Sequence, residues 1–100
     1  MPREEPIKWA YDSIEFAVTA VTDYDLKTNQ SGAFDNVKVA TDILIRTDSD
    51  INFKFNSSSN ATVSLTAPEN ALTFNSLKVS NIFITNTVGT ATLKIFMMGR

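Results

Sequence analysis

Apolar residues occupy alternate positions between residues 37 and 98, and clusters of Ser, Asn, Asp or Gly interrupt them about every 8 to 12 residues. Successive side chains of a β-strand point to opposite faces, so this pattern gives each segment one apolar and one polar face. Evenly spaced short strands rich in β-branched and aromatic residues are typical of sandwiches. The sequence therefore predicts an all-β chain with a single antiparallel β-sandwich of seven or eight strands, in a jelly-roll or an immunoglobulin-like order.

The length of 100 residues suits one domain with one modest core. Residues 1–12 are expected to form an extended N-terminal arm, because Pro6 cannot donate to a sheet ladder and the segment holds a second proline. Residues 13–100 then form the sandwich. The polar stretch 27–36 is predicted to be a flexible loop, with Phe34 as the residue that anchors it.

Interruptions of the alternation predict where strands bend or turn. The phase changes after Ala20, which indicates a bulge or turn near Thr22 and Asp23. Residues 37–45, with Val39 among those facing inward, and residues 51–55 flank a polar turn at 47–50, and this arrangement predicts a hairpin. Helix is an alternative only for residues 11–20.

Four large apolar side chains fall on the outward phase of their strands: Leu44, Phe83, Phe96 and Met98. A contiguous apolar patch left in water favours association, so a subunit interface is one explanation, with Trp9 and Tyr11 of the arm as further members. The other explanation is that the arm, a loop or a bulge covers these side chains within one copy. Both explanations remain open at this point.

Four lysines lie between apolar neighbours and are expected on the solvent side of their strands: Lys38, Lys54, Lys78 and Lys94. Such lysines discourage unwanted strand pairing, and a row of them is alternatively suited to an acidic partner.

The chain contains no His and no Cys, which removes the commonest general base and the most nucleophilic side chain. Asp23 and Asp25 share a strand face and would be the pair for acid–base chemistry. The run Asp48-Ser-Asp50-Ile-Asn52 resembles the start of a calcium loop, but Phe53 and Ser59 stand where an EF-hand needs Gly and Glu. We therefore expect no enzyme activity, no metal site and no cofactor.

The net charge of -2 and the pI of about 4.9 give no general attraction to nucleic acid or to anionic lipid. No stretch approaches the roughly 20 apolar residues of a membrane span. The chain is expected to be soluble, with neither nucleic acid nor membrane as a partner.

Three segments carry a resemblance: Ile43-Leu-Ile-Arg-Thr-Asp-Ser-Asp-Ile-Asn-Phe-Lys-Phe-Asn56, Leu77-Lys-Val-Ser-Asn-Ile-Phe-Ile-Thr-Asn86 and Gly89-Thr-Ala-Thr-Leu-Lys-Ile-Phe-Met-Met-Gly99. Together they resemble small β-sandwich virion structural proteins of tailed bacteriophages, over about the last 60 residues. The resemblance implies a capsid decoration, capsid-stabilising or head accessory protein, often a symmetric oligomer.

The leading hypothesis is a noncatalytic virion subunit that is soluble in the host cytoplasm before assembly and that binds itself and other virion proteins. A carbohydrate-binding or adhesin module is the alternative, with Trp9, Tyr11 or Tyr24 and the 27–36 loop binding a glycan. A hydrolase built on the Asp residues is the third hypothesis.

Overall fold

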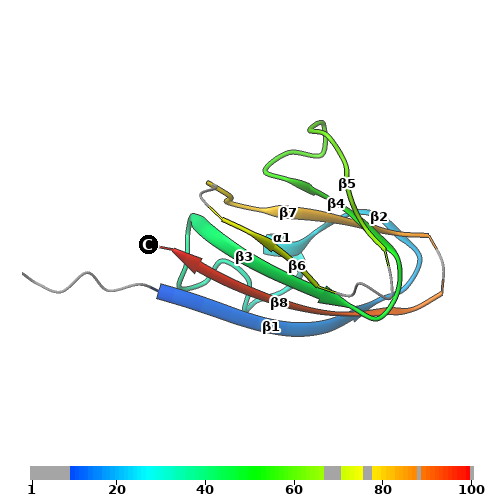
Figure 1. The fold of residues 1–100 in the computed structure, drawn as a ribbon, viewed down its shortest axis with the longest axis horizontal. Coiled ribbons are helices and arrows are strands. Elements are labelled where there is room, and N and C mark those ends of the chain that lie inside the picture. Colours follow the sequence, from blue (N-terminus) through cyan, green and yellow to red (C-terminus); the bar gives the residue numbers. More distant parts are fainter. Residues whose placement is uncertain (1–9, 67–70, 76–77, 88, 100) are drawn as a thin grey trace, which may run out of the picture.

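Eight β-strands and one short helix make up the part of the chain that the computed structural model describes, which is residues 10–66, 71–75, 78–87 and 89–99. The strands are β1 (Ala10–Val18), β2 (Val21–Asp25), β3 (Ala40–Thr47), β4 (Ile51–Phe55), β5 (Val63–Leu65), β6 (Ala71–Phe74), β7 (Ile82–Asn86) and β8 (Ala91–Gly99), and helix α1 (Leu26–Asn29) follows β2. Figure 1 shows the strands in two layers. The predicted all-β sandwich is confirmed.

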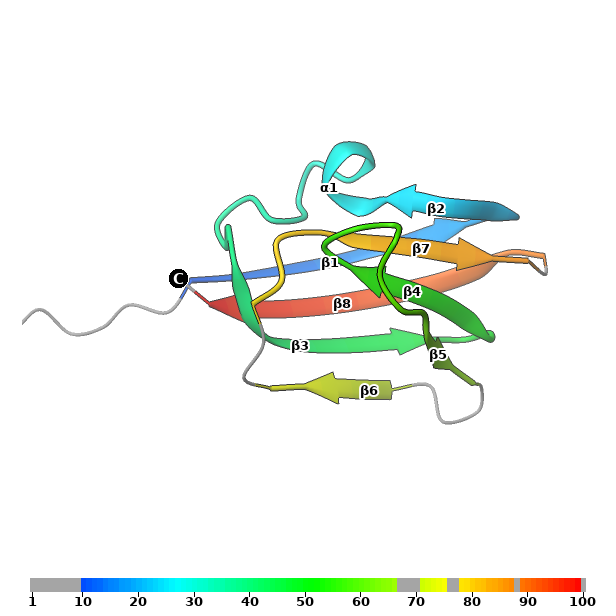
Figure 2. The ribbon, with the colours of Figure 1, turned by 90° about the horizontal axis from the view of Figure 1, so that it is seen from above.

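The strand order is that of a jelly roll. One sheet has the order β1-β8-β3-β6 and the other has the order β2-β7-β4-β5, and all pairings are antiparallel. The pairs β1/β8, β2/β7, β3/β6 and β4/β5 arise when a long hairpin is folded in half and then rolled up, and Figure 2 shows the resulting layers from above. An immunoglobulin-like sandwich would instead pair β1 with β2.

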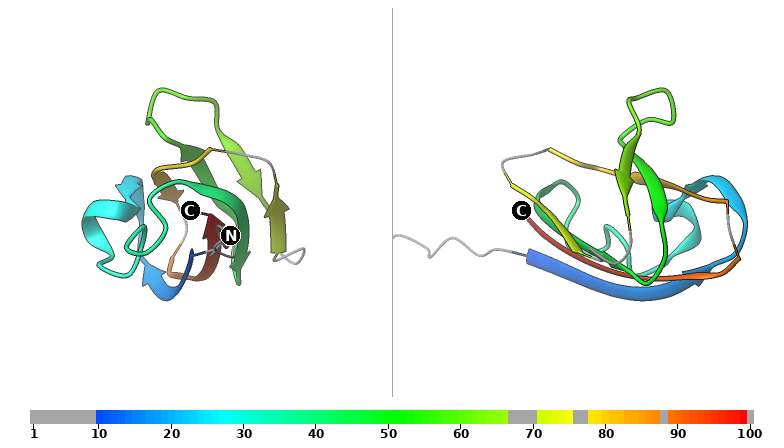
Figure 3. Two further views of the ribbon diagram at one scale, coloured as in Figure 1. Left: turned by 90° about the vertical axis from the view of Figure 1, so that its left-hand side faces the viewer. Right: turned by 45° about the vertical axis from the view of Figure 1, so that its right-hand side comes forward.

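The core lies between the two sheets, where the inward phases of the strands meet. Along β8, residues 91, 93, 95, 97 and 99 are buried and Phe96 is exposed. Ile43 and Ile45 of β3 face the interior from one sheet, and Phe53 of β4 does so from the other, each no more than 1% exposed. Burial of each such side chain stabilises the fold by about 1.5 to 3 kcal/mol. The end-on view in Figure 3 shows the sheets curving around this interior.

The predicted hairpin between residues 37–45 and 51–55 is wrong. Strand β3 pairs with β6 and β8, whereas β4 pairs with β5 and β7, so residues 48–50 cross from one sheet to the other. The Thr47 side chain accepts a hydrogen bond from the Ser49 N–H at 3.2 Å and donates to the Ser49 carbonyl at 2.9 Å, which tightens this crossing. The alternation of apolar and polar residues does not distinguish a hairpin from a corner between two sheets, because in both cases each strand buries one face in the same core.

The bulge predicted near Thr22 and Asp23 is confirmed. The register of β2 against β7 shifts between Val21 and Tyr24, and Asp23 has a positive φ of 50°. A second shift, between Ala40 and Asp42, lies at the start of β3. Residues 37 and 40 are buried before this shift, and Val39, predicted to face inward, is 40% exposed instead.

The polar stretch 27–36 was predicted to be loop throughout, but its first residues belong to a helix. Helix α1 forms a single turn, and Asp25 caps it by accepting the Thr28 N–H at 3.0 Å. The predicted anchor is confirmed, because Phe34 is only 2% exposed. Residues 11–18, where helix was the alternative, are strand.

Strand β1 begins at Ala10, so residues 10–12 belong to the first sheet rather than to an arm. Asp12 faces inward in phase with Phe16 and is 5% exposed, which places it inside the domain. The expected arm is therefore wrong for residues 10–12, and the rest of it, residues 1–9 with Trp9 among them, lies outside the described residues.

Candidate interaction surface

The solvent side of the β1-β8-β3-β6 sheet forms a regular grid, because β1 and β3 both pair in register with β8. Tyr11, Met98 and Asp42 form the first row, Ser13, Phe96 and Leu44 the second, and Glu15, Lys94 and Arg46 the third. We call these residues the outer face. All of them are exposed or half-buried, and rows are separated by about 7 Å along the strands.

The outer face has an apolar centre. Phe96 is 39% exposed, and its ring stacks on that of Tyr11, which is 61% exposed, with 5.7 Å between the centroids. Leu44 lies directly opposite Phe96 on the neighbouring strand and Met98 lies two positions along, both half-buried. A hollow of about 250 Å³ opens between Phe96, Leu44 and the third row. Three of the four residues predicted to lie outside the core thus lie together, with Tyr11 beside them.

Phe83 does not belong to this cluster. It is on β7, in the other sheet, where it pairs in register with Asp25 and Lys54. It is half-buried within a polar surface in which Ser64 Oγ donates to Asn52 Oδ1 at 2.7 Å. Sequence alternation assigned Phe83 correctly to the outside, but it contains no information about which sheet a strand joins.

Charged residues close the outer face at its two ends. Asp42 lies in the first row, and Glu15, Lys94 and Arg46 make up the third row, beside a hollow of about 460 Å³. With the Asn75 amide turned so that its nitrogen faces the neighbouring oxygens, that nitrogen donates to Asp42 Oδ1 at 3.2 Å. The ion pair found among the described residues joins Lys54 to Asp23 at 3.3 Å and lies on the other sheet. Within this part of the chain, Lys94 and Arg46 of the third row therefore form no ion pair with an acidic side chain.

Asp42 and Arg46 were not singled out from the sequence. The signal that would have found them is their position two residues before and two residues after Leu44, in the same outward phase. The expectation that Lys94 faces outward is confirmed, since it is exposed in the third row.

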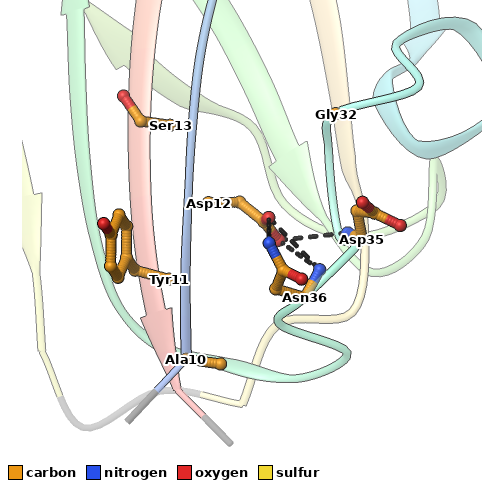
Figure 4. Close-up of a pocket in the computed structure, with 7 residues that line it drawn as sticks. All are labelled: Ala10, Tyr11, Asp12, Ser13, Gly32, Asp35 and Asn36. Carbon is orange, nitrogen blue, oxygen red and sulfur yellow. Dashed lines mark hydrogen bonds between the residues drawn. The ribbon is translucent and has the colours of Figure 1, made fainter.

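A groove of about 700 Å³ runs along β1, and it is the place where a sugar site was expected. Its lining combines residues 10–13 with residues 32, 35 and 36 of the loop. Figure 4 shows the Tyr11 ring on one side of β1, and Asp12 and Asn36 on the other. The Asp12 carboxylate already accepts the Asn36 side-chain amide at 3.0 Å. The aromatic ring and the polar groups therefore do not converge on one ligand position.

Both the ring and the hydroxyl of Tyr24 contact other residues of the domain. Its ring stacks on Phe16 with 6.1 Å between the centroids, and its hydroxyl accepts a hydrogen bond from Gln30 Nε2 at 2.8 Å. Tyr11 and Tyr24, two of the aromatic residues considered for binding a glycan, lie in different sheets, Tyr11 in β1 and Tyr24 in β2.

The Asp23 and Asp25 carboxylates both have structural partners. Asp23 accepts from Lys54 Nζ at 3.3 Å. Asp25 Oδ1 accepts from Asn81 Nδ2 at 2.9 Å and from the Thr28 N–H at 3.0 Å. The Asn81 hydrogen bond, opposed in part by burial and reinforced by Thr28, lowers the pKa of Asp25. A general acid needs the opposite shift.

The acidic turn that resembles a calcium loop is held by protein donors. Asp48 Oδ1 accepts the Thr92 N–H at 2.9 Å, and Asn52 Oδ1 accepts Ser64 Oγ at 2.7 Å. Within the described ranges, no group of three or more acidic side chains is placed to hold a metal ion. In the same ranges, no helix has the length and apolar character needed to cross a bilayer.

Neither a family model nor a curated protein sequence matches the chain. Function is therefore inferred from the geometry of the outer face and from the fold.

Proposed function

We propose that this protein is a noncatalytic structural subunit of a virus particle, a capsid decoration or head accessory protein of a bacteriophage that acts through symmetric self-association. The observation that carries the proposal is the one-sided distribution of exposed apolar side chains. Tyr11, Phe96, Leu44 and Met98 are contiguous on the outer face, while the other sheet presents Phe83 among polar groups. A sandwich that needed only solvent around it would have two polar outer surfaces.

The energetics favour covering this face with protein. Phe96 and Tyr11 keep 39% and 61% of their surface in water, and removing such surface from water contributes about 25 cal/mol per Å². Repetition of a modest contact by symmetry raises the overall affinity without any new contact. A particle surface supplies that repetition, because it presents many equivalent sites.

The fold supports the same class of function by analogy. Jelly rolls with this strand order serve as viral capsid domains and also as lectin domains. The lectin alternative needs an aromatic ring beside polar hydroxyl-binding groups, and β1 separates the Tyr11 ring from Asp12 and Asn36. The resemblance of residues 43–99 to phage virion proteins agrees with the capsid alternative.

Two measurements test this proposal. Sedimentation velocity and native mass spectrometry at about 1 to 100 µM are expected to show reversible oligomers of the purified chain. Co-expression with the products of neighbouring genes should then place ordered copies on assembled particles, visible by electron microscopy. A chain that stays monomeric throughout this range, or that never sediments with particles, would contradict the proposal.

A further inference from the structure

The charges around the apolar centre determine how two copies can meet. Three rows of three side chains allow two face-to-face arrangements related by a two-fold axis in the plane of the sheet. If the axis runs across the strands, the first row of one copy covers the third row of the other. If the axis runs along β8, each row of one copy covers the same row of the other copy, and β1 of one copy covers β3 of the other.

The first arrangement matches unlike groups. Asp42 of each copy faces Arg46 of the other, and Tyr11 faces Glu15, so that a hydroxyl meets a carboxylate. Phe96 and Leu44 of the second row each face their own counterpart on the axis. Met98 comes over Lys94, beside the hollow of about 250 Å³ that Phe96, Leu44, Arg46 and Lys94 line.

The second arrangement places like charges together. Lys94 lies on β8 in the same strand as Phe96, so an axis along β8 sets the ammonium groups of the two copies against each other. It also sets the polar Ser13 against Leu44. Apposed like charges oppose association, and the pairs Glu15–Arg46 and Tyr11–Asp42 that this arrangement offers do not remove that repulsion.

We propose that the outer face binds the same face of a second copy with the strands reversed, and that reciprocal Asp42–Arg46 pairs set this orientation. The inference rests on the proposed self-association and adds its geometry. Stacked sheets lie about 30° from parallel, and the long Arg46 side chain has the reach to bond Asp42 across that angle.

The contact should be weak in solution. A four-stranded face whose β1 and β8 have nine residues each spans roughly 19 by 30 Å, or about 600 Å² per copy. Stable interfaces bury about 800 Å² per partner, so the dimer is expected to form at micromolar concentrations. Its state should therefore be measured at tens of micromolar.

Charge complementation between two variants tests the orientation. Asp42→Lys and Arg46→Glu should each raise the dissociation constant at least about tenfold, because each variant alone opposes like charges. An equimolar mixture should restore a mixed dimer, since the new lysine at position 42 faces the new glutamate at position 46. Native mass spectrometry separates mixed from self-paired dimers by mass.

A second mixture reports the other orientation. Arg46→Glu with Glu15→Lys complements only if the axis runs along β8. In the proposed orientation that mixed dimer keeps one Asp42–Arg46 pair but sets the other Asp42 against the new glutamate at position 46, so it should form more weakly than the Glu15→Lys homodimer. Asp35→Lys and Lys78→Glu reverse exposed charges off the outer face and should leave the dissociation constant unchanged. Circular dichroism and the thermal midpoint of each variant confirm folding.

The outcomes separate the two proposals. If the wild-type chain dimerises but Asp42→Lys and Arg46→Glu do not complement each other, the orientation is wrong and self-association stands. If the second mixture complements, the axis along β8 replaces the one proposed. A wild-type chain that remains monomeric overturns the proposed function itself.

Discussion

The buried carboxylate of Asp12 accepts a hydrogen bond from the backbone N–H of Val37, with 2.9 Å between Oδ2 and the nitrogen. The same carboxylate accepts the N–H groups of Asp35 and Asn36 at 3.0 Å. Strand β1 thereby holds the segment that leads into β3, although the two are far apart in the chain. An inward-facing charge on β1 is satisfied because the loop supplies donors in place of water.

Replacement of Asp12 should therefore be costly. Asp12→Ala removes the acceptor of three backbone donors, one of them buried and two part-buried, and we expect the free energy of unfolding to fall by about 3 kcal/mol. Asp12→Asn keeps one oxygen and should cost less. Urea denaturation measures both, with the exposed Asp35→Ala as a control that should stay within about 0.5 kcal/mol. Equal effects at positions 12 and 35 would contradict this role.

Two glycines should respond differently to substitution by alanine. A Cβ on Gly99 would collide with the backbone carbonyl of Val39 and lie 3.1 Å from Ala40 Cα, so backbone has to move. We expect Gly99→Ala to cost about 1 to 3 kcal/mol in unfolding free energy. Gly89 has open space but a φ of 57°, so Gly89→Ala should cost about 1 kcal/mol through backbone strain alone. Thermal unfolding of both variants compares them, and a neutral Gly99→Ala would show that the sheet end is loose.

The lowered pKa of Asp25 predicts a specific loss of stability in acid. Its carboxylate is held by Asn81 and Thr28 in the folded chain, whereas the unfolded chain has the ordinary pKa of about 3.9. The folded state therefore binds the proton less readily. The contribution to stability is complete above about pH 5, decreases as the pH falls through the unfolded pKa, and is lost below the lower folded pKa.

Asp25→Asn provides the matched comparison, because both hydrogen bonds go to one oxygen, Oδ1, which asparagine retains. The advantage of the wild-type chain over this variant should shrink between about pH 5 and pH 3 in urea unfolding experiments. A difference that stays constant across this range would mean that the carboxylate does not have a shifted pKa.

Phe96 and Phe83 should behave differently, although the sequence treats them alike. Phe96→Asp puts a charge at the centre of the outer face and should raise the dissociation constant of self-association at least about tenfold. Phe83→Asp changes the other sheet and should leave association intact. Sedimentation equilibrium measures both, and dissociation by Phe83→Asp alone would move the interface to the β2-β7-β4-β5 sheet.

Much of the strand pattern could be predicted because it is local. The phase change before Tyr24 located a bulge, and the isolated Phe34 marked where the long loop enters the core. The predictions failed where a non-local contact decided the outcome. Helix α1 is held in part by Asn81, far along the chain, whose Oδ1 accepts the Lys27 N–H at 3.0 Å. The inward phase expected at Val39 was lost at the shift in register between β3 and β8 that follows it.

The candidate site was predictable only in part. Alternation identified Phe96, Leu44 and Met98 as outward. Tyr11, expected to join them from an arm, lies beside them on β1 through its pairing with Met98. The same reasoning grouped Phe83 with them, since inside and outside can be read from period two but sheet membership cannot. Asp42 and Arg46 can be assigned to the candidate surface only after the structure shows that they flank Leu44 on the same face of β3.

By itself the sequence determined the class of fold and the side of each strand that meets the core, because these follow from which neighbours along the chain are apolar. Tertiary structure decided the jelly-roll order, the corner between β3 and β4, and the gathering of one apolar face on one sheet. Those features depend on backbone hydrogen bonds between distant segments. A strand presents the same donors and acceptors to any partner, so the choice among partners is made when the whole core packs.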